Sequence, residues 1–186
     1  MAIFQTSGQA VHFSYVIQGY DATPQSQMAR IMHSVMRQLG ISDGAGLSSI
    51  DLAGLTPLEV RGQCAMIRAC VRSHLRPMEA KALEARYSSD RDTKRFAISA
   101  LADCCGPVVG INPSVALALM WRQHVDRSRK KDFTLRMIAT EYGLSKSTIH
   151  RAEAALKQHL GTLENLALSN LHARFVADGI IEGDPG

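Results

Sequence analysis

The chain has 186 residues, of which 46% are apolar and 5% aromatic, and its 21 Lys/Arg and 17 Asp/Glu give a formal net charge of +4. This length and composition fit one domain, or one domain with a long extension, and allow a real hydrophobic core. No run of about 18 apolar residues occurs, which excludes a membrane-spanning helix.

The first apolar segment alternates with polar residues. Val11, Phe13, Tyr15 and Ile17 are separated by residues such as His12 and Ser14. Because the period is two, the pattern predicts a short strand or an extended N-terminal arm. Such an arm would need a partner edge, for example from a second subunit.

A first amphipathic helix is expected to begin at Thr23–Pro24, an N-cap followed by proline at the first helical position. Its apolar stripe consists of Met28, Ile31, Met32, Val35, Met36 and Leu39. Gly40 ends it, and the Gly-, Ser- and Asp-rich residues 41–55 are typical of a linker. We therefore divide the chain into an N-terminal part, residues 1–55, and a helical domain, residues 56–186.

The second part opens with Thr56-Pro57-Leu58-Glu59, a capping-box sequence that predicts a helix running to about His74. Four arginines, at positions 61, 68, 72 and 76, fall largely on its polar side. They form either a solvated face or a second contact surface for nucleic acid or an acidic partner. Further helices are expected over residues 77–87, 92–105 and 113–125.

Residues 134–160, TLRMIATEYGLSKSTIHRAEAALKQHL, have the spacing of a helix-turn-helix. Thr134 and Ser145 are suitable N-caps, and Gly143 suits the left-handed conformation at the end of the first helix. Ala139 is small where the two helices would touch, and Ile149 is the branched apolar residue facing inward. Leu144 is expected to fill the core beneath the corner.

In such a motif the second helix enters the major groove of duplex DNA by its N-terminal end. Basic and hydroxyl side chains there can pair with base edges or phosphates. The basic run that precedes the motif would contact the sugar–phosphate backbone. The predicted DNA-binding residues are Thr134, Ser145, Lys146, Ser147, Thr148, His150 and Arg151, with Arg127, Arg129, Lys130 and Lys131.

The charge distribution points to the same segment. Residues 121–160 contain nine Lys/Arg and four Asp/Glu, a net charge of +5, whereas residues 161–186 have a net charge of −3. A local excess of positive charge is expected on a phosphate-binding face. The alternative to DNA binding is two packed surface helices whose polar outer faces only contact solvent.

The apolar face of the second helix continues beyond Leu156. Either the helix runs through Gly161 to about Ala177, or it breaks at Gly161 and an amphipathic C-terminal helix occupies residues 162–177. Such a helix could mediate a homodimer or cover the core of its own subunit.

No catalytic or metal-binding pattern emerges. Cys64, Cys70, His74, Cys104 and Cys105 lack the paired spacing of a zinc finger or ribbon, and no phosphate loop, GxSxG or HExxH motif occurs. Four cysteines without a signal peptide indicate a reducing, cytoplasmic location. We expect no enzyme activity and no cofactor.

LRPMEAKALEARY, residues 75–87, resembles the helix that precedes the helix-turn-helix in region 4 of bacterial sigma factors. The matching residues are Leu75, Pro77, Glu79, Leu83, Arg86 and Tyr87. Residues 134–160 are similar to the helix-turn-helix itself, although residues 88–133 intervene here. A helical protein with such an interrupted module is similar to phage late-gene regulators, including Q-type antitermination proteins.

The resemblance implies a protein that acts in a bacterial host cell, binds DNA near a late promoter and contacts RNA polymerase. Our prediction is a mainly α, multi-helix, double-stranded DNA-binding transcription regulator. The alternatives are a phage DNA-packaging recognition subunit of the small-terminase kind and a helical adaptor that binds protein.

Overall fold

The computed structural model describes residues 4–20, 25–38, 55–124 and 133–181. Within them the regular elements are helices, apart from an isolated parallel β-bridge between Phe4 and Ile181. The helices are α1 (Ser7–Gln18), α2 (Gln25–Gln38), α3 (Pro57–His74), α4 (Pro77–Tyr87), α5 (Arg91–Val108), α6 (Pro113–His124), α7 (Leu135–Glu141) and α8 (Lys146–Ala177). The expected mainly α class is confirmed.

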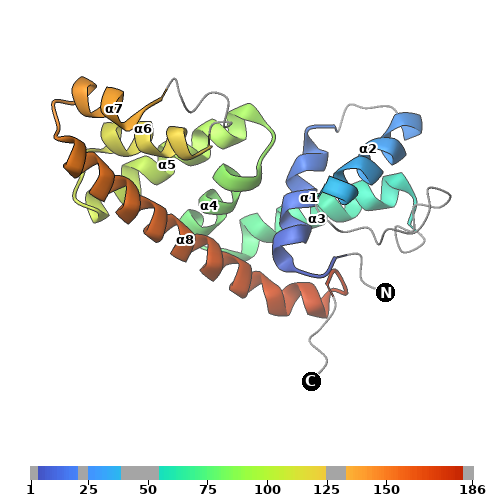
Figure 1. Ribbon diagram of the computed structural model, residues 1–186. Coiled ribbons are helices and arrows are strands. Elements are labelled where there is room, and N and C mark those ends of the chain that lie inside the picture. Colours follow the sequence, from blue (N-terminus) through green and yellow to red (C-terminus); the bar gives the residue numbers. More distant parts are fainter. Residues whose placement is uncertain (1–3, 21–24, 39–54, 125–132, 182–186) are drawn as a thin grey trace.

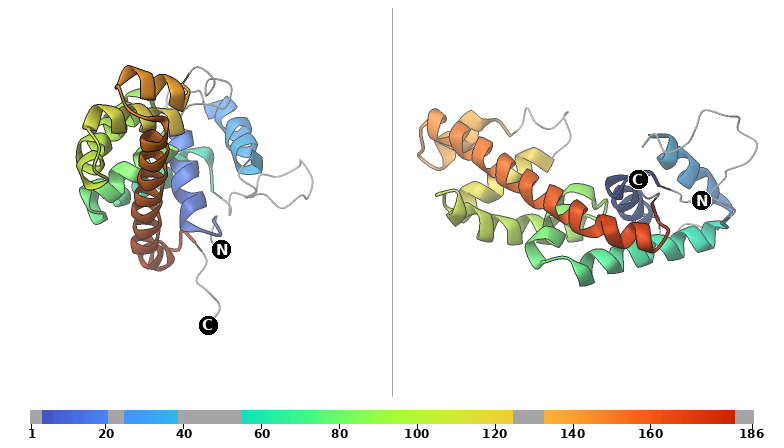
Figure 2. Two further views of the ribbon diagram at one scale, coloured as in Figure 1. Left: turned by 60° about the vertical axis from the view of Figure 1, so that its left-hand side comes forward. Right: turned by 90° about the horizontal axis from the view of Figure 1, so that it is seen from below.

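The helices form two groups, and α8 runs along both (Figure 1). At one end α1, α2 and α3 pack together; at the other end α5, α6 and α7 do, with α4 between the groups. The views in Figure 2 show α8 as a single long rod against this row of shorter helices. No helix in the described part of the chain is long and apolar enough to cross a membrane.

Each group has its own buried cluster. The first contains Phe13, Tyr15, Ile67 and Val71 together with Ala167, Leu171 and Phe175 from the C-terminal half of α8. The second contains Ile98, Leu101, Leu119, Ile138 and Ile149 together with Leu156 and Leu160 from its N-terminal half. Since both clusters include residues of α8, this helix joins the two groups.

The continuity of α8 decides between the two alternatives for the C-terminal region. The helix runs through Gly161 without a break and ends at Ala177. Ala167, Leu171 and Phe175 are fully buried within this chain, so the C-terminal half covers the core of its own subunit. The homodimer stays a prediction. The apolar face of α8 is no argument for it, because that face is covered within the chain.

The predicted N-terminal strand or arm is wrong, because these residues form helix α1. Thr6 caps it by accepting a hydrogen bond from the Gln9 amide at 3.2 Å. Val11, Phe13, Tyr15 and Ile17 are all fully buried, as is Ser14 between them. A helix surrounded by other elements is apolar on most sides, so a short alternation in its sequence carries no reliable period.

Helices from both sides of the predicted domain boundary at residue 55 pack together. Helices α1 and α2 share the first core cluster with α3, which begins after residue 55. The division of the chain at residue 55 stays a prediction about domains. The expected helix start at Thr23–Pro24, the expected end at Leu39–Gly40 and most of the linker lie outside the described residues.

Helix α3 begins as its sequence predicts. Thr56 and Glu59 form a capping box, in which the Glu59 carboxylate accepts from the Thr56 amide at 2.7 Å. The expected polar arginine stripe is only partly correct, because Arg68 is buried and its guanidinium donates to the Ser14 carbonyl oxygen of α1. Helix α1 therefore covers α3 at Arg68, a position that the helical pattern assigns to solvent.

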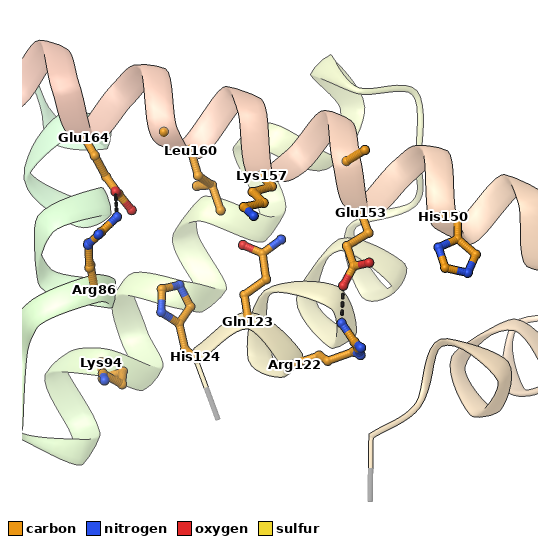
Figure 3. Close-up of a pocket in the computed structure, with 12 residues that line it drawn as sticks. Arg86, Lys94, Arg122, Gln123, His124, His150, Glu153, Lys157, Leu160 and Glu164 are labelled. Atoms are coloured by element: carbon orange, nitrogen blue, oxygen red, sulfur yellow. Dashed lines mark hydrogen bonds and ion pairs between the residues drawn. The ribbon is translucent and has the colours of Figure 1, made fainter. Parts of the chain in front are cut away.

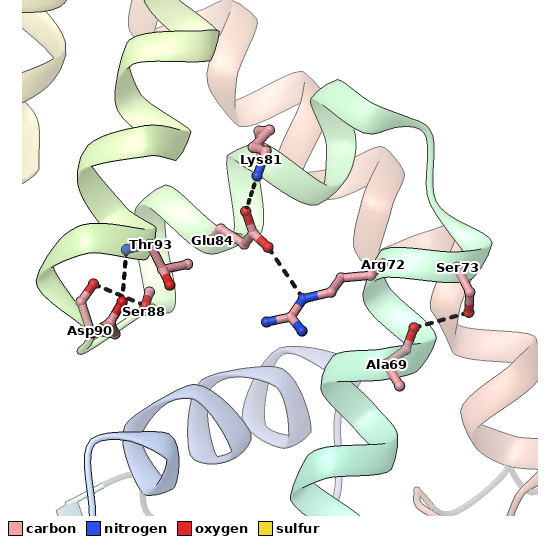
Figure 4. Close-up of polar contacts among 8 residues, drawn as sticks. All are labelled: Ala69, Arg72, Ser73, Lys81, Glu84, Ser88, Asp90 and Thr93. Carbon is pink, nitrogen blue, oxygen red and sulfur yellow. Dashed lines mark hydrogen bonds and ion pairs between the residues drawn. The ribbon is translucent and has the colours of Figure 1, made fainter.

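A polar cluster ties α3 to α4 (Figure 4). Glu84 is buried, and its carboxylate pairs with Lys81 at 2.6 Å and with Arg72 Nε at 3.7 Å. At the next junction Asp90 caps α5 by accepting from the Thr93 amide at 2.7 Å. A buried carboxylate needs such compensating partners, and Arg72 supplies one of them from the neighbouring helix.

Candidate nucleic-acid interface

The corner between α7 and α8 is formed by residues 142–145. Gly143 has φ +63°, in the left-handed region that favours glycine. The Leu144 amide donates to the Ala139 carbonyl at 2.9 Å, and the Gly143 amide donates to the Thr140 carbonyl at 3.3 Å. These two bonds form a Schellman motif, which satisfies the last carbonyls of α7 and turns the chain sharply into α8.

The two helices meet through the residues that the spacing predicts. Ile138 and Ala139 of α7 and Ile149 and Ala152 of α8 are buried in the second core cluster. Leu144 differs from expectation, because 37% of its surface is exposed. Leu144 is not part of the second core cluster, so the core beneath the corner is closed without it.

Two of the predicted DNA-binding residues, Thr134 and Ser145, act as N-caps. Thr134 accepts from the Met137 amide at 3.2 Å, and Ser145 accepts from the Thr148 amide at 3.1 Å. The Ser145 hydroxyl also lies 2.8 Å from the Thr148 hydroxyl and 2.9 Å from the Ser147 hydroxyl. Thr134 and Ser145 thus fix where α7 and α8 begin, and the hydroxyls of Ser147 and Thr148 are engaged with Ser145.

The remaining predicted residues of α8 are turned to solvent. Lys146, Ser147, His150 and Arg151 are exposed over its first two turns. Lys146 and Arg151 form no ion pair with a described residue. The first turn of α8 therefore presents uncompensated positive charge beside backbone N–H groups, a combination that favours anions. Arg127, Arg129, Lys130 and Lys131 lie outside the described residues.

Helix α7 and the middle of α8 contribute further exposed side chains to the candidate interface, and the sequence prediction did not include them. Arg136 is exposed on α7, as are Met137 and Thr140. Lys157 is exposed two turns beyond His150. The signal for all of them was available, because each lies off the apolar positions of its helix.

The residues that resemble sigma region 4 have structural partners in α8. Glu79 accepts a hydrogen bond from Asn170 Nδ2 at 3.2 Å, and Arg86 forms an ion pair with Glu164. Helix α4 is thus fastened to the C-terminal part of α8. Helices α5 and α6 occupy the sequence between α4 and α7.

The cysteines and His74 do not gather. Cys64 and Cys105 are buried, Cys104 is exposed, and Cys70 Sγ lies 3.6 Å from His74 Nδ1. Burial raises the pKa of the Cys105 thiol to about 11, which keeps it protonated at neutral pH. Among the described residues no three His, Cys, Asp or Glu side chains form a group that could hold a metal ion.

Comparison with known proteins gives no further assignment. No protein-family model matches this chain, and no curated protein matches its sequence significantly.

Proposed function

We propose that this protein binds double-stranded DNA through α7, the corner and the first two turns of α8. The observation that carries the proposal is the exposed set of Lys146, Ser147, His150 and Arg151 on a helix whose start is fixed by a capped, glycine-containing turn. Lysine and arginine side chains recognise guanine edges and phosphates, and serine can pair with several bases.

The placement of α8 supports the same proposal. Its inward face is held by Ile149, Ala152 and Leu156 in the second core cluster, so the opposite face is presented rigidly. A rigid helix loses little conformational entropy on binding. Exposed Arg136 on α7 would contact the DNA backbone beside the groove, the role of the first helix in such motifs.

Two substitutions test the recognition helix directly. Lys146→Ala and Arg151→Ala should each weaken duplex binding by about 1–3 kcal/mol and relax specificity if the side chain reads a base. If it contacts a phosphate, binding should weaken on all sequences and the salt slope should fall by about one unit. Fluorescence anisotropy over ~50–200 mM salt measures both quantities.

The matched control is Arg37→Ala, at an exposed position of α2 in the other helix group. It removes the same charge and should leave DNA affinity unchanged at ~150 mM salt, where the Debye length is about 8 Å. If Lys146→Ala and Arg151→Ala bind like the Arg37→Ala control, the assignment of the recognition helix is wrong.

The finer proposal, a transcription regulator of the phage late-gene kind that acts with RNA polymerase, rests on the sequence resemblance alone. Recovery of fragments from the source genome at ~150 mM salt, followed by sequencing, tests it. A sharp peak just downstream of a late promoter's start supports antitermination, whereas a peak at a packaging site supports the packaging subunit. Undetectable DNA affinity even at ~50 mM salt supports a protein-binding adaptor, because electrostatic binding is strongest there.

A further inference from the structure

A pocket lies between α8 and the ends of three other helices (Figure 3). Its volume is about 780 Å³. One wall is the N-terminal part of α8, from His150 to Glu164, and the other is formed by residues of α4, α5 and α6. Side chains that are remote in the sequence, such as Arg86, Arg122 and Lys157, thus point into one space.

The pocket carries net positive charge. Its four Lys/Arg side chains are Arg86, Lys94, Arg122 and Lys157, and its two carboxylates are Glu153 and Glu164. Each carboxylate pairs with an arginine, Glu164 with Arg86 and Glu153 with Arg122. Among the described residues that line the pocket, four cations and two anions give a formal net charge of +2.

The pocket wall also contains donors without acceptors. Arg122 Nε and Gln123 Nε2 are buried atoms with no hydrogen-bond partner. Buried donors are usually paired, because an unpaired one retains the free-energy cost of its desolvation. Since neither atom is accessible to solvent, a ligand oxygen reaches them only when these side chains change rotamer.

We propose that this pocket is a phosphate-binding site. Positive charge and planar guanidinium donors are the groups that recognise phosphate oxygens in proteins. The volume falls within the range of about 300–1,000 Å³ that is usual for small-molecule sites, so it accommodates more than one phosphate. The ligand is a phosphorylated small molecule or consecutive phosphates of a nucleic-acid strand.

The pocket adjoins the exposed face of α8 at His150. This residue lines the pocket and is also one of the exposed side chains at the start of the helix. A phosphate held near it would be adjacent to the candidate DNA face. The proposal itself does not require that face to bind DNA, since the pocket has its own charged side chains and donors.

Gly161 offers a way to block the pocket without disturbing the fold. It lines the pocket, and a Cβ atom at this position would meet no atom within 4 Å apart from its chain neighbours and the backbone of its own helix. Gly161→Leu places a good helix former there and fills part of the space. Gly62 of α3 has the same open surroundings away from the pocket, so Gly62→Leu is the matched control.

The test uses the full chain and two probes, inorganic pyrophosphate and duplex DNA. Calorimetry at ~150 mM salt should detect pyrophosphate binding that weakens on the order of tenfold in Lys157→Gln, which removes one charged donor, and in Gly161→Leu. Gly62→Leu should bind like the unmodified chain. Circular dichroism checks that each variant retains its helices.

The outcomes distinguish the two sources of phosphate. Pyrophosphate binding that both pocket variants weaken supports a site for a free phosphorylated molecule. If pyrophosphate does not bind, reduced duplex affinity in both variants, with a salt slope lower by about one unit in Lys157→Gln, supports backbone phosphates instead.

The proposal is overturned if neither probe responds to the pocket variants, even when Lys146→Ala and Arg151→Ala weaken DNA binding. Pyrophosphate that binds equally well to all variants also overturns it, because the anion is then held elsewhere. Pocket-dependent pyrophosphate binding in a chain without DNA affinity would refute the proposed DNA-binding function and leave the phosphate site standing.

Discussion

Replacement of Gly161 by alanine should stabilise the protein. The residue lies near the midpoint of the 32-residue helix α8, where glycine is less favourable than alanine by about 0.8–1 kcal/mol. The added methyl group would meet no atom within 4 Å apart from its chain neighbours and the backbone of its own helix, so neither a steric cost nor much burial changes this figure. We expect the free energy of unfolding to rise by about 0.5–1 kcal/mol.

Urea denaturation followed by circular dichroism measures the gain. With a slope of about 2 kcal/mol/M, the midpoint should rise by about 0.3–0.5 M. The melting temperature should rise by about 1–4 °C for a chain of this size. Because both core clusters include residues of α8, the change should appear in a single transition if the two groups unfold together.

Two other helical glycines serve as controls, one in open and one in crowded surroundings. Gly62→Ala in α3 should also stabilise, since its surroundings are open. Gly106→Ala in α5 should destabilise, because its Cβ would lie 3.1 Å from Ala116 Cβ and 3.2 Å from the Ile111 carbonyl oxygen. A gain at Gly62 with no gain at Gly161 would refute the reasoning, because it would mean that α8 is not helical through Gly161.

Three further predictions concern the corner, the cores and a half-buried histidine. Gly143→Ala should cost about 1–2 kcal/mol of unfolding free energy, because φ +63° is unfavourable for a residue with a Cβ atom; an unchanged urea midpoint would contradict the left-handed corner. Ile149→Ala and Leu171→Ala remove fully buried side chains from the two clusters, and each should cost about 2–5 kcal/mol by urea denaturation; a loss below 1 kcal/mol would contradict the burial of that residue. Burial, with Arg86 and Lys94 nearby, lowers the pKa of His12 below 6.5, so the unfolded chain binds more protons and stability falls as the pH drops from about 6.5 toward the lowered value. His12→Gln should reduce the difference between urea midpoints at pH 7.5 and 5.5, and an unchanged difference would show that other groups cause it.

The local signals in the sequence were sufficient for much of the candidate DNA interface. Thr134, Gly143 and Ser145 occupy their predicted capping and corner positions because these conformations are set by neighbours within a few residues. The inward positions of Ile138 and Ile149 follow from helical spacing in the same way. Lys146 and Arg151 are exposed because they lie on the opposite side of α8 from these apolar positions.

What depends on distant neighbours was decided only by the tertiary structure. The apolar period of α1 is hidden because other helices surround it, and Arg68 is buried because α1 supplies a carbonyl acceptor beside it. The pocket exists because α4, α5 and α6 bring Arg86, Lys94 and Arg122 opposite α8. The sequence by itself determined where helices begin and which faces are apolar, since caps and periodicity act within a few turns. Which faces meet depends on the packing of all the helices at once, and no local pattern encodes it.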